Sequence, residues 1–338
     1  MTSNSRVLLP LERLDLADST VIFTPDVAEP GYWVGCASVL FESDKNRFVL
    51  TYRRRRPRGH SDGDRGYRCA VAVSTDGVAF TDVWSVNKSE LSAPSMERFS
   101  LINSQGGYQL YISYVDPADN RWRIDLMEAA DIDQFKIGSR IPVLTAATTD
   151  TEGVKDPYVL RRGPVTYLLA SYAAKMSDPK AARAAHATAD IYNVGATTHP
   201  TGIATSVDGR TFNWHGEVFA VGAGWDRYQT RVNSVVPLGD VGFLGFYDGS
   251  GSHEENFEER TGLAVSPDLF TWHRLTPDAP WLQTTNGIGS VRYVDAHLID
   301  GQWWIYFEMT RPDGAHELRL AVRPAGRPDG GGGSHVRA

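Results

Sequence analysis

The sequence predicts an all-β protein folded as a five-bladed β-propeller, on three observations. Runs of alternating apolar and polar residues recur along the chain and fall into five sets of three predicted strands. The first strands of the sets begin about sixty residues apart, with one longer interval, near Cys36, Arg98, Pro157, Val232 and Tyr293. Four sets end in similar turns: STDGVAF (74–80), AADIDQF (129–135), SVDGRTF (206–212) and SPDLFTW (266–272). A recurring multi-strand unit of this size is typical of a propeller.

These units predict one domain over residues 1–325, with blades near 36–90, 96–145, 154–222, 228–283 and 287–324. The fifth unit lacks an outer strand after its third strand. The segment STVIF (19–23) could supply that strand and close the ring, which would leave no exposed sheet edge. The Ala-rich stretch 178–193 predicts a short helix inserted in the third blade. Residues 326–338 are Gly-rich and polar, and we expect them to be disordered.

Composition excludes several classes of protein. With 41% hydrophobic and 22% charged residues, the chain can bury a large core. Its net charge of −7 argues against a nucleic-acid or anionic-membrane partner, because both are normally met by a basic surface. The sequence shows no signal-peptide pattern and no long apolar run, which favours a cytoplasmic protein.

Motifs that bind metals or cofactors are missing from the sequence. The two cysteines, Cys36 and Cys69, indicate neither a disulfide framework nor a cysteine metal site. The sequence contains no metalloprotease, phosphate-loop or serine-elbow motif. We therefore expect no cofactor, although a structural cation could occupy the channel of the propeller.

Charged pairs stand at the heads of two apolar strands, in MERFSLI (96–102) and VKDPYVL (154–160). In a propeller blade the first strand lines the central channel, and its head opens on one face. The loop between the second and third strands returns to that face. The sequence therefore predicts a funnel formed by the five strand heads and by loops at 53–64, 116–120, 173–192, 248–258 and 308–313.

Five such units, with ERF in the second, KDPYVL in the third and YDGS in the fourth, resemble the five-bladed propeller glycosidase superfamily. That superfamily includes glycoside hydrolase families 32, 43, 62, 117 and 130. The resemblance covers about residues 20–325. It implies a funnel that binds a terminal sugar, and two carboxylates that cleave its glycosidic bond, one as acid and the other as base or nucleophile.

The acids at the strand heads are the candidates for catalysis: Glu97, Asp156 and Asp295. We expect Glu97 and Asp156 to serve as acid and base, and Asp295 to orient them or to raise the pKa of one of them. The candidates for substrate binding are Arg98, Lys155, Arg231, Asn233, Asp248, His253, Tyr293 and Trp33. Each has a structural alternative: Asp156 could cap a turn, Asp295 could pair in the channel wall, and Trp33 could pack between blades. Strand alternation would turn Arg98 and Lys155 away from the adjacent acids. The arginine run 53–58 could bind an anionic substrate, but the acids Asp62 and Asp64 that follow it favour a solvated or carboxylate-paired loop.

One departure from the superfamily bears on the chemistry. Families 32 and 43 carry an Asp at the head of the first blade, whereas no acid lies between Tyr32 and Leu40 in this chain. Glu29, Asp62 or Asp64 could reach the site instead, or the chemistry could differ. The phosphorolytic members of family 130 also lack that Asp and hold phosphate with basic residues. Here Arg231, Arg98, Lys155 and His253 could serve that role.

We therefore expect a hydrolase that acts on a small glycoside or oligosaccharide. The first alternative is a phosphate-dependent glycoside phosphorylase. The second is a catalytically silent propeller that binds a sugar or serves a biosynthetic pathway. The sequence carries no indication of an oligomeric state.

Overall fold

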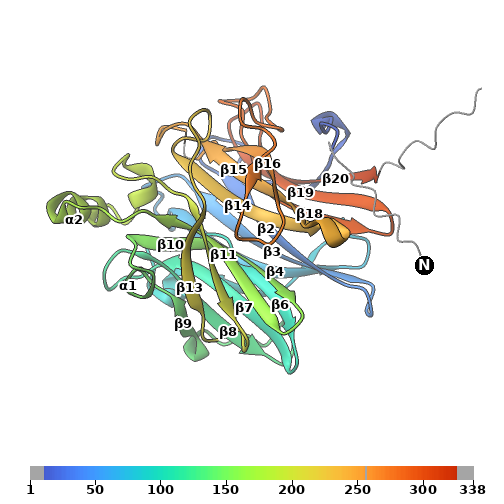
Figure 1. Ribbon diagram of the computed structural model, residues 1–338, viewed down its shortest axis with the longest axis horizontal. Coiled ribbons are helices and arrows are strands. Elements are labelled where there is room, and N and C mark those ends of the chain that lie inside the picture. Colours follow the sequence, from blue (N-terminus) through green and yellow to red (C-terminus); the bar gives the residue numbers. More distant parts are fainter. Residues whose placement is uncertain (1–10, 256, 326–338) are drawn as a thin grey trace, which may run out of the picture.

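A computed structural model describes residues 11–255 and 257–325, and the fold within these ranges is all-β, as the sequence predicts (Figure 1). The strands pair in antiparallel units of four. The first unit contains β2 (Trp33–Glu42), β3 (Arg47–Arg56), β4 (Arg65–Ser74) and β5 (Thr81–Asn87). The second contains β6 (Ser100–Ser104), β7 (Gly107–Val115), β8 (Trp122–Ala129) and β9 (Ile141–Leu144).

The remaining units continue this pattern. The third contains β10 (Gly153–Arg162), β11 (Val165–Ala173), β12 (Thr201–Ser206) and β13 (Asn213–Phe219). The fourth contains β14 (Gln229–Pro237), β15 (Phe243–Ser250), β16 (Arg260–Ser266) and β17 (His273–Arg274). The fifth contains β18 (Val291–Ile299), β19 (Gln302–Thr310), β20 (His316–Pro324) and the N-terminal β1 (Thr20–Phe23).

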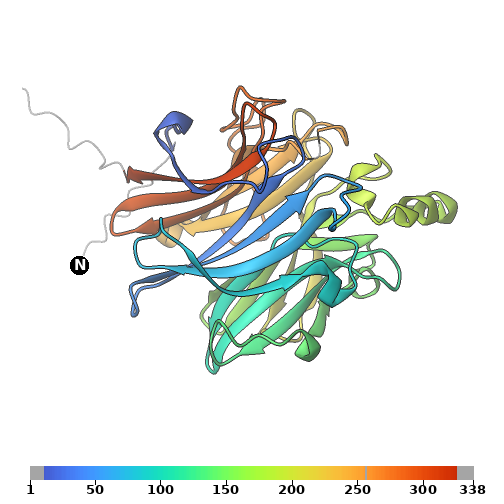
Figure 2. The ribbon, with the colours of Figure 1, turned by 180° about the vertical axis from the view of Figure 1, so that it is seen from behind.

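The N-terminal strand lies beside the C-terminal strand (Figure 2). In that pairing Thr20 faces Leu320 and Val21 faces Arg319, so the segment predicted to complete the fifth unit does pair there. Single parallel bridges join Arg260 to Val291 and Trp33 to His316, which link the fourth, fifth and first units into one hydrogen-bonded path.

Helices are few within the described ranges. The helix predicted in the third unit is present as α2 (Pro179–Ala187), and it projects from the side of the molecule (Figure 1). The side chain of Asp178 caps its first turn, and proline occupies its first position, where no backbone N–H is needed. The others are α1 (Ala146–Thr149) and the 3₁₀ turns η1 (Leu16–Asp18), η2 (Lys88–Leu91), η3 (Ile137–Ser139), η4 (Ile191–Asn193) and η5 (Gly239–Val241). None of the described helices has the length and apolarity that crossing a membrane requires.

Among the described residues the apolar core is divided among six clusters, each between neighbouring units; the sixth joins the second and third units beside the inserted helix. Val49 of the first unit packs with Leu110 of the second, and Ile124 of the second packs with Leu168 of the third. Further clusters join the third unit to the fourth, the fourth to the fifth, and the fifth to the first. Each unit therefore buries both of its faces, which is why its strands are apolar on both sides.

Three of the four predicted turns share one hydrogen-bond pattern. In the turn at 206–209, the hydroxyl of Ser206 donates to Asp208, and the backbone N–H groups of Arg210 and Thr211 donate to the same carboxylate. The turns at 74–79 and 266–271 repeat this arrangement. The turn at 129–135 has Ala129 in place of the serine and lacks those bonds among the described contacts. The tail predicted to be disordered, 326–338, lies outside the described residues.

Candidate active site

The heads of the inner strands are irregular, and this irregularity gathers their side chains. The pairing register shifts at the heads of β2, β10, β14 and β18. At equivalent positions Cys36, Asp156 and Tyr293 adopt left-handed backbone angles, with φ of 57°, 56° and 51°. A bulge re-aims side chains, so successive residues can point to the same side of a strand. The expectation that alternation turns Lys155 away from the acids was therefore wrong.

The gathered side chains form a buried cluster of alternating charges, which we call the head cluster. It consists of Arg53, Glu97, Lys155, Asp156, Arg231, Asp248, Glu259, Arg292, Tyr293 and Glu308. Every one of these residues is at most 9% exposed. Charges buried this deeply are stable in a fold only when each is paired or hydrogen-bonded.

Glu97 stands where the cluster meets a small cavity. Its carboxylate is paired with Arg53, and its Oε2 lies 3.8 Å from Lys155 Nζ. The hydroxyl of Tyr293 donates to its Oε1 at 3.0 Å. Burial alone would raise the pKa of Glu97, but the charges of Arg53 and Lys155 outweigh it and hold that pKa well below its usual range. Glu97 is therefore ionised at neutral pH.

Asp156 is fully buried beside the same hydroxyl. Its Oδ2 lies 2.9 Å from Arg231 Nη1, 3.4 Å from Lys155 Nζ and 3.5 Å from the hydroxyl of Tyr293. Lys155 and Tyr293 thus each contact both Glu97 and Asp156. Burial raises the pKa of Tyr293 well above its ordinary value, so the hydroxyl keeps its proton and acts as a donor.

Arg231 holds the next carboxylate of the cluster. Its Nη2 lies 2.5 Å from Asp248 Oδ2, and its guanidinium stacks over the ring of Tyr293, with 3.9 Å from Cζ to the ring centre. The backbone N–H of Tyr293 donates to Asp248 at 3.0 Å. Burial raises the pKa of Asp248 although the charge of Arg231 opposes the shift. Arg231 and Asp248, both candidates for substrate binding, instead support Tyr293 from within the wall.

Glu308 of β19 reaches the head of the first inner strand, where the chain has no acid of its own. The backbone N–H of Cys36 donates to its Oε2 at 3.2 Å, and a Cβ atom at Gly35 would overlap that carboxylate. Arg292 and His316 hold the other oxygen, at 2.6 and 2.7 Å. Burial alone would raise the pKa of Glu308, but the charge of Arg292 holds it well below its usual range. Asp64, a sequence-based substitute for the missing acid, pairs with Lys88 instead.

Asp295 belongs to a different part of the channel wall. Its Oδ2 accepts from the backbone N–H of Val39 at 2.5 Å and lies 3.6 Å from Arg98 Nη2. None of its contacts among the described residues is with Glu97 or Asp156. Arg98 also donates to the backbone carbonyl of Asn233 at 2.5 Å. Asp295, Arg98 and Asn233 therefore connect neighbouring inner strands. The structure does not bring Asp295 to Glu97 and Asp156.

His253 and Trp33 also differ from the expectation. His253 lies beyond the cluster, 42% exposed at its side chain, beside Glu254. The ring of Trp33 is buried and already covered, because it stacks on His316 at 4.3 Å and carries the guanidinium of Arg55 at 3.9 Å. We find no free face on which Trp33 could stack a sugar.

The arginine run follows the alternation of β3. Arg53 and Arg55 point inward and are buried, whereas Arg54 pairs with Asp26 on the outside. The sequence predicted a solvated or carboxylate-paired loop here. Arg53 is indeed paired with carboxylates, but both inward residues are buried on a strand and not in a loop. Inward arginines could have been recognised from the period-2 pattern that β3 continues through TYRRRR. Glu259, Arg292 and Glu308 were also missed, because only tertiary pairing shows their role.

The cavity beside Glu97 is small and more basic than acidic. Its volume is about 10 Å³, which is room for about one water molecule. The charged groups that line it are Arg53, Arg55, Arg65, Lys155 and Arg292 against Glu97, Asp190 and Glu259. Among the described residues Arg55 has no carboxylate partner, and it lies against the rings of Trp33 and Phe257. Burial, and next the charge of Arg53, lowers the pKa of Arg55 to about 9.

A metal site is not evident in this part of the chain. Within residues 11–255 and 257–325, no group of three or more His, Cys, Asp or Glu side chains is arranged to hold a metal ion. The thiol of Cys36 lies 3.5 Å from Glu97 Oε1, and burial raises its pKa well above the ordinary value. It therefore stays a neutral thiol.

Comparison with known proteins identifies the fold. No protein-family model and no curated protein sequence matches the chain. Among solved structures, a β-1,2-mannobiose phosphorylase from Listeria innocua is 15% identical with a TM-score of 0.61, over 93% of this chain and 96% of that one. A second structure comes from work on the GH130 family of mannoside phosphorylases, a family described there as containing glycoside hydrolases that target β-1,2 mannosidic linkages in Candida mannan. It is 14% identical with a TM-score of 0.61, over 91% of this chain and 92% of that one.

A third similar structure, a thermostable family-43 glycoside hydrolase, is 12% identical with a TM-score of 0.59, over 89% of this chain and 92% of that one. Identities this low establish the fold and not the activity. The superfamily resemblance inferred from ERF, KDPYVL and YDGS is thereby confirmed at the level of fold, because the chain shares the fold of these glycoside hydrolases and mannoside phosphorylases.

Proposed function

We propose that this chain is a five-bladed propeller enzyme that cleaves a glycosidic bond by hydrolysis at the head cluster. The five antiparallel units would be the blades, and β1 would close the ring. Two observations support the ring: β1 pairs with β20, and one of the apolar clusters lies between the fifth and first units. The substrate would be a terminal sugar of a small glycoside or oligosaccharide.

The observation that carries the proposal is the meeting of Glu97 and Asp156 at the hydroxyl of Tyr293. The three residues come from the heads of three different units, and Lys155 also contacts both acids. Both acids have an oxygen within 3.5 Å of the hydroxyl, so they are close enough to act on one glycosidic bond. Backbone bulges and left-handed angles hold this geometry, and such strain clusters at functional sites.

In the proposed reaction Glu97 is the base. It takes a proton from a water molecule in the cavity, whose oxygen bonds to the anomeric carbon. The bond from that carbon to the leaving oxygen breaks, and the leaving oxygen receives a proton from Asp156, which must first take up that proton from solvent. Asp156 is left as a carboxylate and Glu97 is left protonated, so a proton returns to solvent before the next turnover. Arg53 and Lys155 keep Glu97 ionised, whereas Tyr293 orients it. Because the cavity has room for one water molecule, binding of a sugar must displace side chains over it, with Phe257 and Arg55 the first candidates.

Phosphorolysis is the second candidate, and the uncompensated guanidinium of Arg55 favours it. A buried cation without a carboxylate partner suits an anionic co-substrate. In that reaction a phosphate oxygen replaces water at the anomeric carbon, and the product is a sugar phosphate. The similar structures include a mannobiose phosphorylase, which makes mannosides the first substrates to test.

The test is turnover of aryl pyranosides, aryl furanosides and β-mannobioses, with and without inorganic phosphate, followed by NMR. A Glu97→Gln, Asp156→Asn double variant serves as the blank. Sugar release without phosphate that the variant loses supports hydrolysis, and sugar phosphate formed only with phosphate supports the second candidate. Full activity in the variant contradicts both. A sugar that binds without turnover supports the silent propeller.

A further inference from the structure

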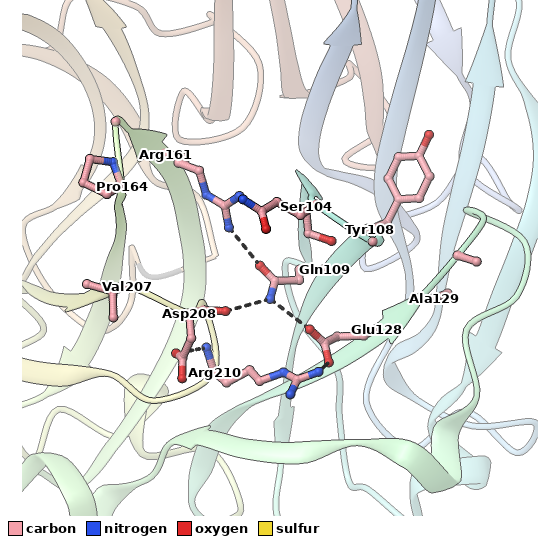
Figure 3. Close-up of a pocket in the computed structure, with 14 residues that line it drawn as sticks. Ser104, Tyr108, Gln109, Glu128, Ala129, Arg161, Pro164, Val207, Asp208 and Arg210 are labelled. Atoms are coloured by element: carbon pink, nitrogen blue, oxygen red, sulfur yellow. Dashed lines mark hydrogen bonds and ion pairs between the residues drawn. The ribbon is translucent and has the colours of Figure 1, made fainter.

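A second, much larger pocket lies at the opposite ends of the strands. It is a groove of about 780 Å³ between the second and third units, and three hairpin turns form its walls (Figure 3). Those turns are 104–107, 163–164 and 207–210. Its volume is in the range of small-molecule sites, which hold about 300 to 1,000 Å³.

This groove is separate from the head cluster. Arg161, on its wall, and Lys155 both lie on β10, six residues apart. At about 3.3 Å per residue they are about 20 Å apart along the strand. A ligand in the groove would not touch the proposed catalytic residues, so the inference does not rest on the proposed function.

The floor of the groove is a buried glutamine. Gln109 is 2% exposed, and its Nε2 donates to Glu128 at 3.0 Å and to the backbone carbonyl of Asp208 at 3.2 Å. Arg161 Nη2 donates to Gln109 Oε1 at 3.5 Å, so the glutamine lies between the arginine and the acid, as Figure 3 shows. This network fixes the floor before any ligand binds.

The charges in the groove leave one guanidinium uncompensated. Glu128 is paired with Arg210 at 2.5 Å. Asp208 accepts from the backbone N–H groups of Arg210 and Thr211, which lowers its pKa to about 2. Among the described residues Arg161 has no carboxylate partner, and its other side-chain bond goes to the hydroxyl of Thr166 at 3.3 Å. A planar guanidinium with free N–H groups is suited to a carboxylate.

Apolar side chains lie on the same wall as the turns. Val207 is 82% exposed, the most exposed of the large hydrophobic side chains in the described ranges, and Pro164 lines the groove with it (Figure 3). A ligand with an apolar C–H face and several hydroxyl groups could contact Val207 and Pro164 while bonding to Glu128 and Arg210.

We propose that this groove is a second ligand site, which binds a saccharide bearing a carboxylate. The carboxylate of a uronic acid unit pairs with Arg161, the ring hydroxyls bond to the Glu128–Arg210 pair, and the C–H face packs on Val207. No bond is made or broken.

Isothermal titration with methyl glucuronide tests this site, with methyl glucoside and inorganic phosphate as comparison ligands. The Arg161→Gln variant is the test, and Arg162→Gln is the matched control. Arg162 is the next residue, is also exposed, and lies over the ring of Phe243 instead of lining the groove. Both variants lose one positive charge from the same turn, so they change the overall field equally.

We expect methyl glucuronide to bind the native protein and the Arg162→Gln variant equally, and the Arg161→Gln variant at least about tenfold more weakly. Equal binding by both variants, or a similar loss in both, overturns the site. Methyl glucoside binding as tightly as the glucuronide overturns the role of the carboxylate. If phosphate binds as tightly as methyl glucuronide and also loses affinity in Arg161→Gln, the groove binds any small anion, and the proposal that it binds a saccharide is overturned.

Discussion

The hydroxyl of Tyr293 occupies the position on which the proposed chemistry depends. Its backbone is left-handed, with φ of 51°, and the side chain is fixed by the guanidinium of Arg231 at 3.9 Å. A bulky residue rarely adopts this conformation without strain, so the surrounding contacts must offset its cost. The result is a neutral donor held between Glu97 and Asp156.

Removing that hydroxyl should impair turnover more than stability. We expect Tyr293→Phe to lower kcat at least about tenfold, because a hydrogen bond to a charged group contributes about 1.5–3 kcal/mol. Tyr306→Phe is the matched control, since its buried hydroxyl donates to the carbonyl of Gly77 at 2.9 Å outside the head cluster. Equal kcat in the native protein and Tyr293→Phe, measured on the same substrate, would remove Tyr293 from the mechanism.

The turn aspartates give a pH dependence with a definite sign. Hydrogen bonds from two backbone N–H groups and from Ser206 lower the pKa of Asp208 to about 2. The unfolded value is about 3.9. The stabilising contribution is therefore complete above about pH 4 and is lost as the pH falls toward 2. NMR titration of the Asp208 carboxyl should give a midpoint near 2, and a midpoint near 4 would show that the turn bonds do not persist in solution.

At the scale of elements, the inserted helix is attached at two points. His186 of α2 contacts Glu152 at 2.8 Å, and Arg121 lies 3.2 Å from the same carboxylate. Farther along, Asp190 pairs with Arg58 and lies 3.4 Å from Arg65, both from the first unit. Asp190 also lines the cavity, so this attachment places the insertion over the head cluster.

Breaking the second attachment should loosen the insertion locally. We expect Asp190→Ala to speed amide hydrogen exchange across residues 188–195 at least about tenfold, because removal of the carboxylate leaves the buried Arg65 and the half-exposed Arg58 without their partner. Lys175→Ala is the control, since its pair with Asp150 is exposed and contributes little. Unchanged exchange in Asp190→Ala would mean that other contacts hold the segment.

The strands were predictable from the sequence because period-2 patterns and Ser-x-Asp turns are local signals. The bulges were not, since a left-handed Asp156 or Tyr293 is set by tertiary contacts. For that reason Glu97 and Asp156 were correctly placed together, whereas Lys155 was given the wrong direction and Asp295 the wrong neighbours. Glu308 could not be assigned, because its contact with Cys36 joins residues 272 positions apart in the chain.

At the scale of the whole molecule, β1 connects the two ends of the chain. Arg319 of β20 donates to the hydroxyl of Ser19 at 2.7 Å, and Phe23 stacks on Tyr52 at 4.5 Å. Without β1, the edge of β20 would be exposed and open to pairing with another chain.

Deletion of residues 1–23 should therefore lower the melting temperature by at least about 5 °C and promote self-association, because it also exposes the apolar side chains against which residues 11–23 pack. Calorimetry and size-exclusion chromatography measure the two effects. Thr20→Ala changes one exposed side chain of β1 and serves as control. An unaltered melting temperature in the deleted protein would contradict closure of the ring by β1.

The central claim is that Glu97 acts on a glycosidic bond, and the most direct measurement is the rate of sugar release by Glu97→Gln. Glu42→Gln is the matched control, because Glu42 is also buried but is bonded to Tyr108, outside the head cluster. The substrate is the one that the native protein turns over among the aryl glycosides and β-mannobioses proposed above. We expect Glu97→Gln to fold but to have a kcat at least about 100-fold lower than the native protein, and Glu42→Gln to keep the native kcat. Equal loss in both variants, or a native rate in Glu97→Gln, would contradict the account.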